Sequence, residues 1–244
     1  MSFRSKTLRA ANRLISPFGF EIVRNDPART HARQLRSLVR RFGIDRVIDV
    51  GANQGQFAME LLQDGYAGAI DSIEPLPEPH AVLFARAARF PRWKVFDAVA
   101  VGATESSEVR MEVAGNSVSS SILPMLELHV AAAPRSRPVG HVNIRQTTLD
   151  ALYPDGVRGP ALLKVDTQGY ERQVLQGGVR LLRSVAAVDL ELSLAPLYEG
   201  QPDWLEVIHW MRQHGFAVWS IAPEFHHPDT MRLLQVNGIF VRAD

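Results

Sequence analysis

The sequence predicts an α/β protein built on one parallel, doubly wound sheet with helices on both faces. From Ile44 onward, short apolar runs alternate with segments whose apolar residues recur at helical spacing. The first run, residues 46–50, ends in a glycine-containing turn that leads into a helical pattern. The last two runs follow one another with no helical segment between them, so the final strand is expected to be antiparallel to its neighbour.

The predicted elements follow one another in a regular order. The expected strands are residues 46–50, 69–73, 93–101, 108–113, 142–147, 161–165, 187–192, 217–221 and 236–241. The expected helices of this part are residues 56–63, 77–89, 170–175 and 202–214. Ligands of doubly wound sheets bind at the carboxyl ends of the strands. We therefore expect the loops after Val50, Ile73, Asp97, Val165 and Glu191 to meet in space.

Residues 1–43 are expected to form a basic helical extension before a domain that spans residues 44–244. Helical spacing breaks at residues 16–19, and Pro27 is expected to open a second helix that Gly43 ends. Residues 1–46 contain 11 Lys and Arg against 3 Asp and Glu, whereas the rest contains 16 against 23. This extension is expected to pack on the body or on a second copy in a homodimer. The alternative is contact with an anionic membrane surface.

Composition excludes several classes of protein. The chain has no cysteine, which excludes disulfides, zinc–thiolate sites and a cysteine nucleophile. No apolar run approaches the roughly 20 residues that cross a bilayer, and the N-terminus lacks a signal-peptide pattern. Nucleic acid is not expected as a partner, because no aromatic–basic groove or known reading motif accompanies the basic residues. We expect a cytoplasmic protein, with peripheral contact at the inner membrane face as the open alternative.

The turn after the first strand predicts a nucleotide-type cofactor. Gly51 and Gly55 stand at Gly-x-x-x-Gly spacing, and glycine lets a backbone turn tightly and approach a ligand. Asn53 replaces the middle glycine of the dinucleotide fingerprint, which favours a smaller group such as the amino-acid end of S-adenosylmethionine over a pyrophosphate. Glu74, at the end of the second strand, can accept both ribose hydroxyl hydrogens. The predicted cofactor contacts are Asp49, Gly51, Ala52, Asn53, Gly55, Glu74, Asp97 and Ala98.

Three segments resemble the FkbM-type S-adenosylmethionine-dependent methyltransferases. They are residues 47–55, 72–75 and 163–171, with the sequences VIDVGANQG, SIEP and LKVDTQGYE. The resemblance covers the chain from about residue 44 to residue 241. It implies a class I methyltransferase fold, which is Rossmann-like with seven strands, and O-methylation, often of sugars or natural-product hydroxyls. Such families usually have Glu where this chain has Gln168, so no acidic role carries over to that position.

Methylation of a hydroxyl needs the acceptor oxygen held in line with the C–S bond and a base that takes its proton. Asp166, at the end of a core strand, is the first candidate base, with capping of the next helix as its structural alternative. Glu191 ends the following strand and is the second candidate. His141, before an alternating strand, is the third. Asp166 and Glu191 together could also hold a divalent cation such as magnesium, which the sequence leaves open.

Polar side chains outside the core strands are candidates for binding the acceptor. Residues 115–121 form a small polar loop whose amide and hydroxyl groups suit sugar hydroxyls, with a flexible linker as the alternative. Tyr198 could stack on a sugar ring. Glu171 is a further candidate, and a favourable interaction with the dipole of its own helix is its structural alternative. The predicted substrate contacts are Asn116, Ser119, Ser120, Glu171, Tyr198 and His226.

The predicted function is an S-adenosylmethionine-dependent O-methyltransferase acting on a sugar hydroxyl. The basic extension resembles that of actinobacterial members that methylate deoxy-sugars on glycolipids, so a glycolipid or another glycosylated small molecule is the expected acceptor. A nicotinamide-dependent oxidoreductase is the alternative enzyme, opposed by the missing middle glycine and by the lack of a Tyr-x-x-x-Lys segment. A nucleotide-binding module without catalysis is the other alternative, opposed by the intact segment 166–171.

Overall fold

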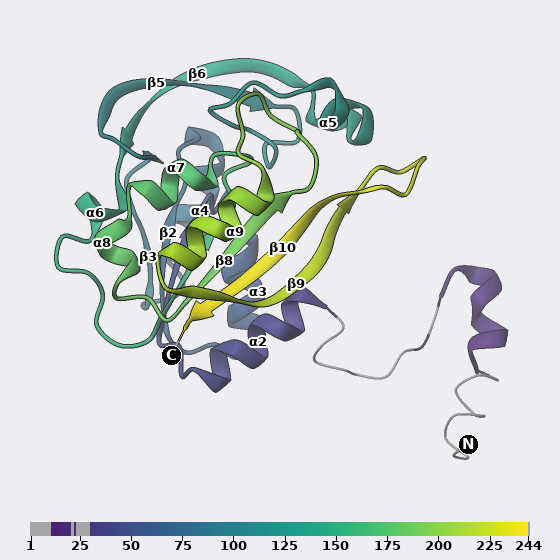
Figure 1. Ribbon diagram of the computed structural model, residues 1–244, viewed down its shortest axis with the longest axis horizontal. Helices are drawn as coiled ribbons and strands as arrows, with labels where there is room; N and C mark the ends of the chain where they lie inside the picture. The colour runs from purple at the N-terminus through teal and green to yellow at the C-terminus, as the bar shows by residue number, and fades with distance from the viewer. Residues whose placement is uncertain (1–10, 21, 23–29, 244) are drawn as a thin grey trace.

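The computed structural model describes residues 11–20, 22 and 30–243 of the 244-residue chain (Figure 1). Its body is a seven-stranded sheet between two layers of helices, and a three-stranded sheet lies across the top in this view. The predicted break at residues 16–19 is confirmed as the short 3-10 helix η1 Ser16–Phe18, which ends at Gly19. The predicted helix start at Pro27 lies outside the described residues.

The main sheet has the strand order β3-β2-β1-β7-β8-β10-β9. Its strands are β1 Arg46–Val50, β2 Ala69–Ile73, β3 Trp93–Val95, β7 Ala161–Val165, β8 Ala187–Ser193, β9 Phe216–His226 and β10 Leu233–Arg242. Six strands run in the same direction, and β10 alone opposes them, pairing antiparallel with both β8 and β9. The structure confirms the predicted doubly wound sheet and its antiparallel last strand. The strand order reverses between β1 and β7, where such folds bind their ligands.

Side chains alternate across each strand and divide the core into two layers. Val47 and Leu162 point to one face, Ile48 and Leu163 to the other, and all four are fully buried. The first face is covered by α2 His31–Arg41, α3 Gln56–Gln63 and α4 Pro77–Ala87. The second face is covered by α6 Leu149–Leu152, α7 Glu171–Gln176, α8 Val179–Leu182 and α9 Trp204–Gln213.

Helix α2 belongs to the predicted N-terminal extension, yet it packs directly on the sheet. Its residues Leu35 and Leu38 lie three positions apart on one helix face and are buried against Val47 and Ile239. Burial of this apolar stripe ties residues 31–41 to the body. The division of the chain at residue 43 stays a prediction.

The predicted strand 93–101 was wrong as a single element. The strand in the main sheet, β3, ends at Val95. The chain then joins the three-stranded sheet as β4 Ala100–Val101, which pairs with β6 Pro138–Thr147. The third strand of this small sheet is β5 Ser106–Ala114, antiparallel to β6. Val99, Ala100 and Val101 are all buried. Apolar residues stand on both sides of Asp97, and they look the same in the sequence whether one sheet or two receive them, so hydrophobicity did not reveal the split.

Several short elements were not predicted. They are α5 Glu127–Ala132, the 3-10 helix η3 Pro134–Ser136, and the four-residue helices α6 and α8. Each is too short to show helical periodicity, and tertiary contacts hold them in place. No helix among the described residues is long and apolar enough to cross a membrane.

Candidate active site

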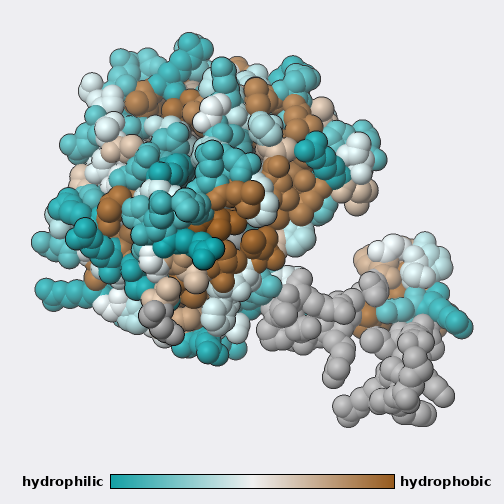
Figure 2. Space-filling view, viewed as in Figure 1, coloured by the Kyte–Doolittle hydropathy of each residue, from teal (hydrophilic) through white to brown (hydrophobic). Residues whose placement is uncertain are grey.

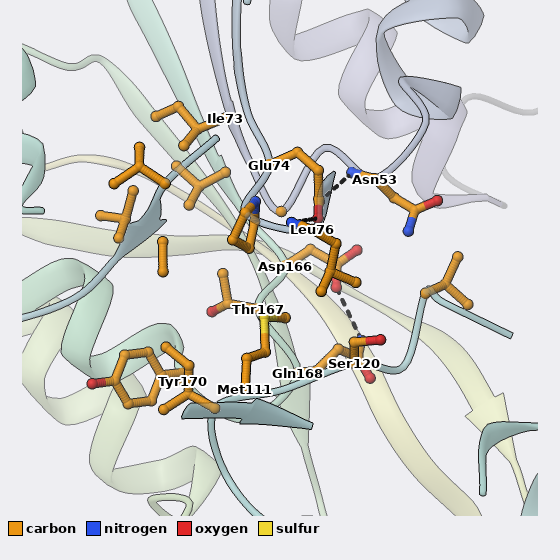
Figure 3. Close-up of a pocket in the computed structure, with 18 of the residues that line it drawn as sticks. Asn53, Ile73, Glu74, Leu76, Met111, Ser120, Asp166, Thr167, Gln168 and Tyr170 are labelled. Carbon is orange, nitrogen blue, oxygen red and sulfur yellow. Dashed lines mark hydrogen bonds between the residues drawn. The ribbon is translucent and has the colours of Figure 1, made fainter. Parts of the chain in front are cut away.

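A pocket opens at the carboxyl ends of β1, β2 and β7, where the strand order reverses (Figure 3). The space between its lining atoms is about 540 Å³, a figure that includes open solvent at its mouth. Glu74 and Asp166 contribute carboxylates, and Ile73, Leu76 and Val99 contribute apolar wall. The other lining residues are Val50, Gly51, Asn53, Pro75, Ala100, Val101, Met111, Ser117, Val118, Ser120, Ile122, Thr167, Gln168 and Tyr170.

Gly51 is required by the backbone on which the pocket is built. Its φ is +79°, and a Cβ added here would lie 1.8 Å from the carbonyl oxygen of Asp166. Gly51 was expected to leave space for a ligand, but the end of β7 already fills that space. The N–H groups of Gly51 and Ala52 are not free for a ligand, because both donate to the carbonyl of Ile73.

Asn53 and Gly55 also adopt left-handed backbone conformations, with φ of 45° and 83°. Asn53 lines the pocket, and its side-chain amide donates to Ser117 Oγ at 3.2 Å, so the glycine loop contacts the polar loop 115–121. Gly55 faces the other way, where a Cβ would lie 2.8 Å from the Trp93 ring. Ala52 is buried as well and does not line the pocket. Gly55 and Ala52 therefore shape the loop from behind, which corrects their prediction as direct cofactor contacts.

Glu74 is the buried acid of the pocket. Its Oε2 accepts the N–H of Asn53 and its Oε1 accepts the N–H of Leu76, both at 2.8 Å. Burial raises the pKa of Glu74 to about 7, although these two N–H groups act in the opposite direction. A carboxylate has about four acceptor positions, so two remain for ligand hydroxyl groups.

Asp49 is fully buried in the middle of β1 and does not line the pocket. Its Oδ1 lies 3.4 Å from Lys164 Nζ, and burial raises the pKa of Asp49 against the effect of this ammonium group. Although burial opposes it, the carboxylates of Asp166 and Asp49 raise the pKa of Lys164 above its ordinary value. The structure thus corrects the prediction of Asp49 as a cofactor contact, because it supports Lys164 from inside the sheet.

Asp166 is the acid that the pocket leaves accessible. Its side chain is 36% exposed, and its Oδ2 lies 3.3 Å from Lys164 Nζ. Its Oδ1 accepts a hydrogen bond from Gln168 Nε2 at 3.0 Å. These two contacts fix the carboxylate after the end of β7, in the same pocket as Glu74 (Figure 3).

Glu191 does not line the pocket, contrary to its prediction as a catalytic group. Its Oε2 accepts hydrogen bonds from Gln168 Nε2 at 2.7 Å and from Gln235 Nε2 at 2.8 Å. Burial and the nearby carboxylates of Asp166 and Glu171 raise the pKa of Glu191 well above its ordinary value. Gln168 therefore stands between Glu191 and the pocket.

Two predicted substrate contacts hold the loop after β7 instead. Tyr198 is only 1% exposed, and its hydroxyl lies 2.7 Å from Gln168 Oε1, so its ring cannot stack on a sugar. Glu171 Oε1 accepts the N–H groups of Thr167 and Gly169 at 2.9 and 3.1 Å. Burial raises the pKa of Glu171 to about 7, opposed by the loop N–H groups. Both side chains shape the loop and stay outside the pocket lining.

The model of the methyltransferase FkbM domain matches residues 49–218, which is more than half of the chain. The chain belongs to the FkbM methyltransferase family. It is an S-adenosylmethionine-dependent methyltransferase, and its resemblance to this family is confirmed. The alternatives of a nicotinamide-dependent oxidoreductase and of a module without catalysis are wrong.

Solved methyltransferases share this fold at low sequence identity. Methyltransferase FkbM from Methylobacillus flagellatus KT matches with 15% identity and a TM-score of 0.51, over 88% of this chain and 48% of that one. The methyltransferase domain of bacterial CtHen1-C matches with 11% identity and a TM-score of 0.49, over 90% and 100%. Glycopeptide N-methyltransferase MtfA, crystallised with S-adenosylmethionine, matches with 13% identity and a TM-score of 0.45, over 100% and 98%. A sequence comparison with curated proteins found no match.

The pocket of this FkbM methyltransferase fits S-adenosylmethionine. That molecule carries a ribose diol, a flat aromatic heterocycle, a sulfonium centre and an amino-acid end. Glu74 offers carboxylate acceptors for the diol, and Ile73 and Val99 offer apolar wall for the heterocycle. When bound, S-adenosylmethionine supplies an electrophilic methyl group.

Three residues of the polar loop 115–121 line the pocket, namely Ser117, Val118 and Ser120. Ser120 lines the pocket and accepts the N–H of Ala114 at 2.9 Å. Asn116 and Ser119 are not part of the lining, since the Asn116 side chain donates to Ser119 Oγ at 3.0 Å and accepts its N–H. These two residues hold the shape of the loop, which corrects their prediction as substrate contacts.

Four further predicted residues lie outside the pocket lining. Asp97 and Ala98 are exposed in the loop between β3 and β4, and Asp97 borders a neighbouring hollow instead. His141 is exposed on β6 and pairs with Glu112 of β5. His226 is exposed at the end of β9. The small sheet and the hairpin of β9 and β10 carry the two histidines away from the strand ends that form the pocket, so the structure contradicts both predictions.

The sequence argument missed Thr167, Tyr170, Ser117, Val118 and the lining role of Gln168. Thr167 and Gln168 lie inside the segment quoted for the family resemblance, so their position after a core strand was the available signal. Ser117 and Val118 belong to the loop already singled out. Among the described residues, no group of three or more His, Asp or Glu side chains is arranged to hold a metal ion.

Proposed function

We propose that this FkbM methyltransferase transfers its methyl group to a sugar hydroxyl. The observation that carries the proposal is Asp166, an accessible carboxylate at the end of β7 in the same pocket as Gly51 and Glu74. A sugar hydroxyl has a very high pKa, so it must lose its proton as the new bond forms. Asp166 is the group that would accept that proton as the methyl carbon leaves sulfur and bonds to oxygen.

The surroundings of Asp166 support a base rather than a simple ion pair. Lys164 and Gln168 hold the carboxylate from behind, and its remaining acceptor positions face the pocket. A base held in this way needs no reorganisation when the acceptor arrives, which favours proton transfer. Ser117 and Ser120 line the same pocket and offer hydroxyl groups that suit a polyhydroxylated acceptor.

We further propose a glycolipid or another glycosylated small molecule as acceptor, met at the inner face of the membrane by a cytoplasmic protein. In the described part of the extension, the side chains of Leu14, Phe18, Phe20 and Ile22 are 75%, 76%, 69% and 48% exposed. Figure 2 shows apolar and hydrophilic side chains side by side in the segment 11–20, apart from the body. Apolar side chains within a basic segment suit an anionic lipid surface, and a second copy of the chain is the competing partner.

An acceptor screen tests the proposal. The enzyme is incubated with methyl-labelled S-adenosylmethionine and a panel of deoxy-sugar glycolipids, the corresponding free glycosides and amine-bearing glycopeptides, and products are mapped by tandem mass spectrometry. We expect label on a sugar oxygen. Label on nitrogen only, or no transfer to any hydroxyl by enzyme that binds S-adenosylmethionine, would contradict the proposal. Sedimentation with anionic and neutral vesicles, and analytical ultracentrifugation without lipid, separate membrane contact from dimerisation.

A further inference from the structure

Gln168 uses its side-chain amide to join three other side chains. Its Nε2 donates to Asp166 Oδ1 at 3.0 Å and to Glu191 Oε2 at 2.7 Å, and its Oε1 lies 2.7 Å from the hydroxyl of Tyr198. The backbone is fixed as well, because Ser121 Oγ donates to the carbonyl of Gln168 at 2.7 Å. The residue is 8% exposed and adopts a left-handed φ of 56°.

The orientation of the amide follows from its neighbours. With Nε2 between the two carboxylates, both of its N–H groups have acceptors. The one hydroxyl proton of Tyr198 has two acceptors within reach, Gln168 Oε1 at 2.7 Å and the carbonyl of Ser119 at 2.9 Å. A flipped amide would set its oxygen against two carboxylates. Burial and the nearby carboxylates raise the pKa of Tyr198, so its hydroxyl stays a neutral donor.

The bridge stands where two acids would otherwise share a cation. Asp166 and Glu191 come from the ends of the neighbouring strands β7 and β8, and one nitrogen lies within 3.0 Å of both. Glutamate in place of Gln168 would bring three carboxylates together at converging strand ends, a donor set that suits magnesium or manganese. Gln168 keeps the same shape but supplies two N–H donors and no charge.

We propose that Gln168 is a positioning residue whose amide bridges Asp166 and Glu191 and takes the place of a divalent cation at the active site. The bridge aims Asp166 into the pocket and shields it from Glu191. Its effect on turnover rests on the proposed function of Asp166 as base, whereas the bridge itself does not depend on that assignment.

The test compares Gln168→Glu with Gln235→Glu by calorimetric titration with manganese chloride in the presence of S-adenosylmethionine. Gln235 is the matched control, because its amide also donates to Glu191 at 2.8 Å and it adds the same charge without contacting Asp166 in the structure. We expect Gln168→Glu to bind Mn²⁺ at least about tenfold more tightly than the wild type and Gln235→Glu. Asp166→Asn added to Gln168→Glu should abolish that gain.

Three outcomes of this titration would overturn the proposal. The first is no gain in Mn²⁺ affinity for Gln168→Glu, and the second is an equal gain in affinity for Gln235→Glu. The third is Mn²⁺ binding by the wild type that Asp166→Asn removes. If Gln168→Glu fails to fold, the exchanged pair Gln168→Glu with Glu191→Gln restores one amide and two carboxylates. This pair is expected to fold, to bind S-adenosylmethionine and to gain no Mn²⁺ affinity. Tight Mn²⁺ binding by the pair, or failure of the pair to fold, would count against the bridge.

A second measurement separates positioning from packing. Gln168→Leu keeps the approximate volume of the side chain but removes both donors, so the carboxyl of Glu191 should titrate at higher pH by about one unit. The measurement is ¹³C NMR of carboxyl-labelled protein, with Glu191→Gln used to assign the signal. An unchanged midpoint would overturn the bridge. A failed acceptor screen would leave both tests intact, so the proposed function and this inference can fail separately.

Discussion

The two halves of the pocket are built in different ways. The cofactor half, residues 49–55 and 72–76, consists of two strand ends whose backbones bond to each other, through Gly51 and Ala52 to Ile73. The acid half places Asp166 and Gln168 in the pocket and holds them through Glu191, Tyr198 and Gln235, so its side chains come from two strands and two loops. A half made by local backbone geometry can be recognised as a motif. A half made by distant side chains can be recognised only once the chain is folded.

The largest expected effect tests whether Gly51 is needed for the close approach of the glycine loop to the backbone of Asp166, rather than for ligand contact. Gly51→Ala would place its Cβ 1.8 Å from the backbone of Asp166, so we expect a loss of about 3 kcal/mol or more in the free energy of unfolding, or failure to fold. Gly65→Ala is the matched control. Gly65 has a φ of +86° with nothing within 4 Å of the added Cβ, so the cost should be about 1 kcal/mol. Equal costs in urea denaturation would show that the contact with Asp166 is unimportant.

The next effect tests the acid half through its accessible carboxylate. Asp166→Asn should cut methyl transfer by about 100-fold or more and leave the affinity for S-adenosylmethionine within about threefold, because only proton removal is lost. The measurements are turnover with the acceptor found in the screen and calorimetry for the cofactor. His141→Ala is the control and should keep full turnover, since the structure places His141 outside the pocket lining. A large loss in His141→Ala with none in Asp166→Asn would reverse the assignment.

A smaller effect distinguishes Glu74, which belongs to the cofactor half of the pocket, from Glu171, which holds the loop after β7. The pKa values of Glu74 and Glu171 are both raised to about 7 by burial, but only Glu74 lines the pocket. Ribose hydroxyls bind to the ionised carboxylate, so the affinity for S-adenosylmethionine should be full above the pKa of Glu74 and fall as pH drops through it. We expect a loss of about tenfold between about pH 8 and about pH 6.

Substitution of each acid separates their contributions to this pH dependence. Glu74→Gln should flatten the pH profile of cofactor affinity. Glu171→Gln should preserve the profile, because its Oε1 still accepts the loop N–H groups and it does not meet the cofactor. If Glu171→Gln flattens the profile and Glu74→Gln does not, the roles of the two acids are exchanged.

The smallest effect tests the side-chain hydrogen bond between Asn53 of the glycine loop and Ser117 of the polar loop. Ser117→Ala removes the acceptor for Asn53 Nδ2, a partly buried hydrogen bond of 3.2 Å. We expect the affinity for S-adenosylmethionine to fall by about threefold to fivefold, which corresponds to about 1 kcal/mol. Ser107→Ala, exposed on β5, is the control and should bind as the wild type does. An unaffected Ser117→Ala would mean that the loops close without this bond.

Much of the main sheet was predictable because its signals are local. The bounds of β1, β2 and β7 match the predicted runs, since strands buried on both faces are short, mostly apolar segments. The turn at Gly51 and the acid at Glu74 were found for the same reason. Strands β3 and β4, which share one apolar run, were not separated, because which sheet receives a residue depends on partners far along the chain.

The candidate site divides in the same way. The sequence by itself determined that a strand ends at Val50, that a glycine turn and an acid follow at the spacing of a cofactor site, and that Asp166 ends another strand. Only the tertiary structure decided that Asp166 faces the pocket while Glu191 lies behind Gln168, and that Tyr198 and Glu171 hold the loop. The physical reason is how far apart along the chain the interacting residues lie. A turn needs a few neighbouring residues with suitable φ and ψ, whereas a bridge between carboxylates needs side chains that are up to 69 positions apart, Asp166 and Gln235, to meet at one edge of the sheet.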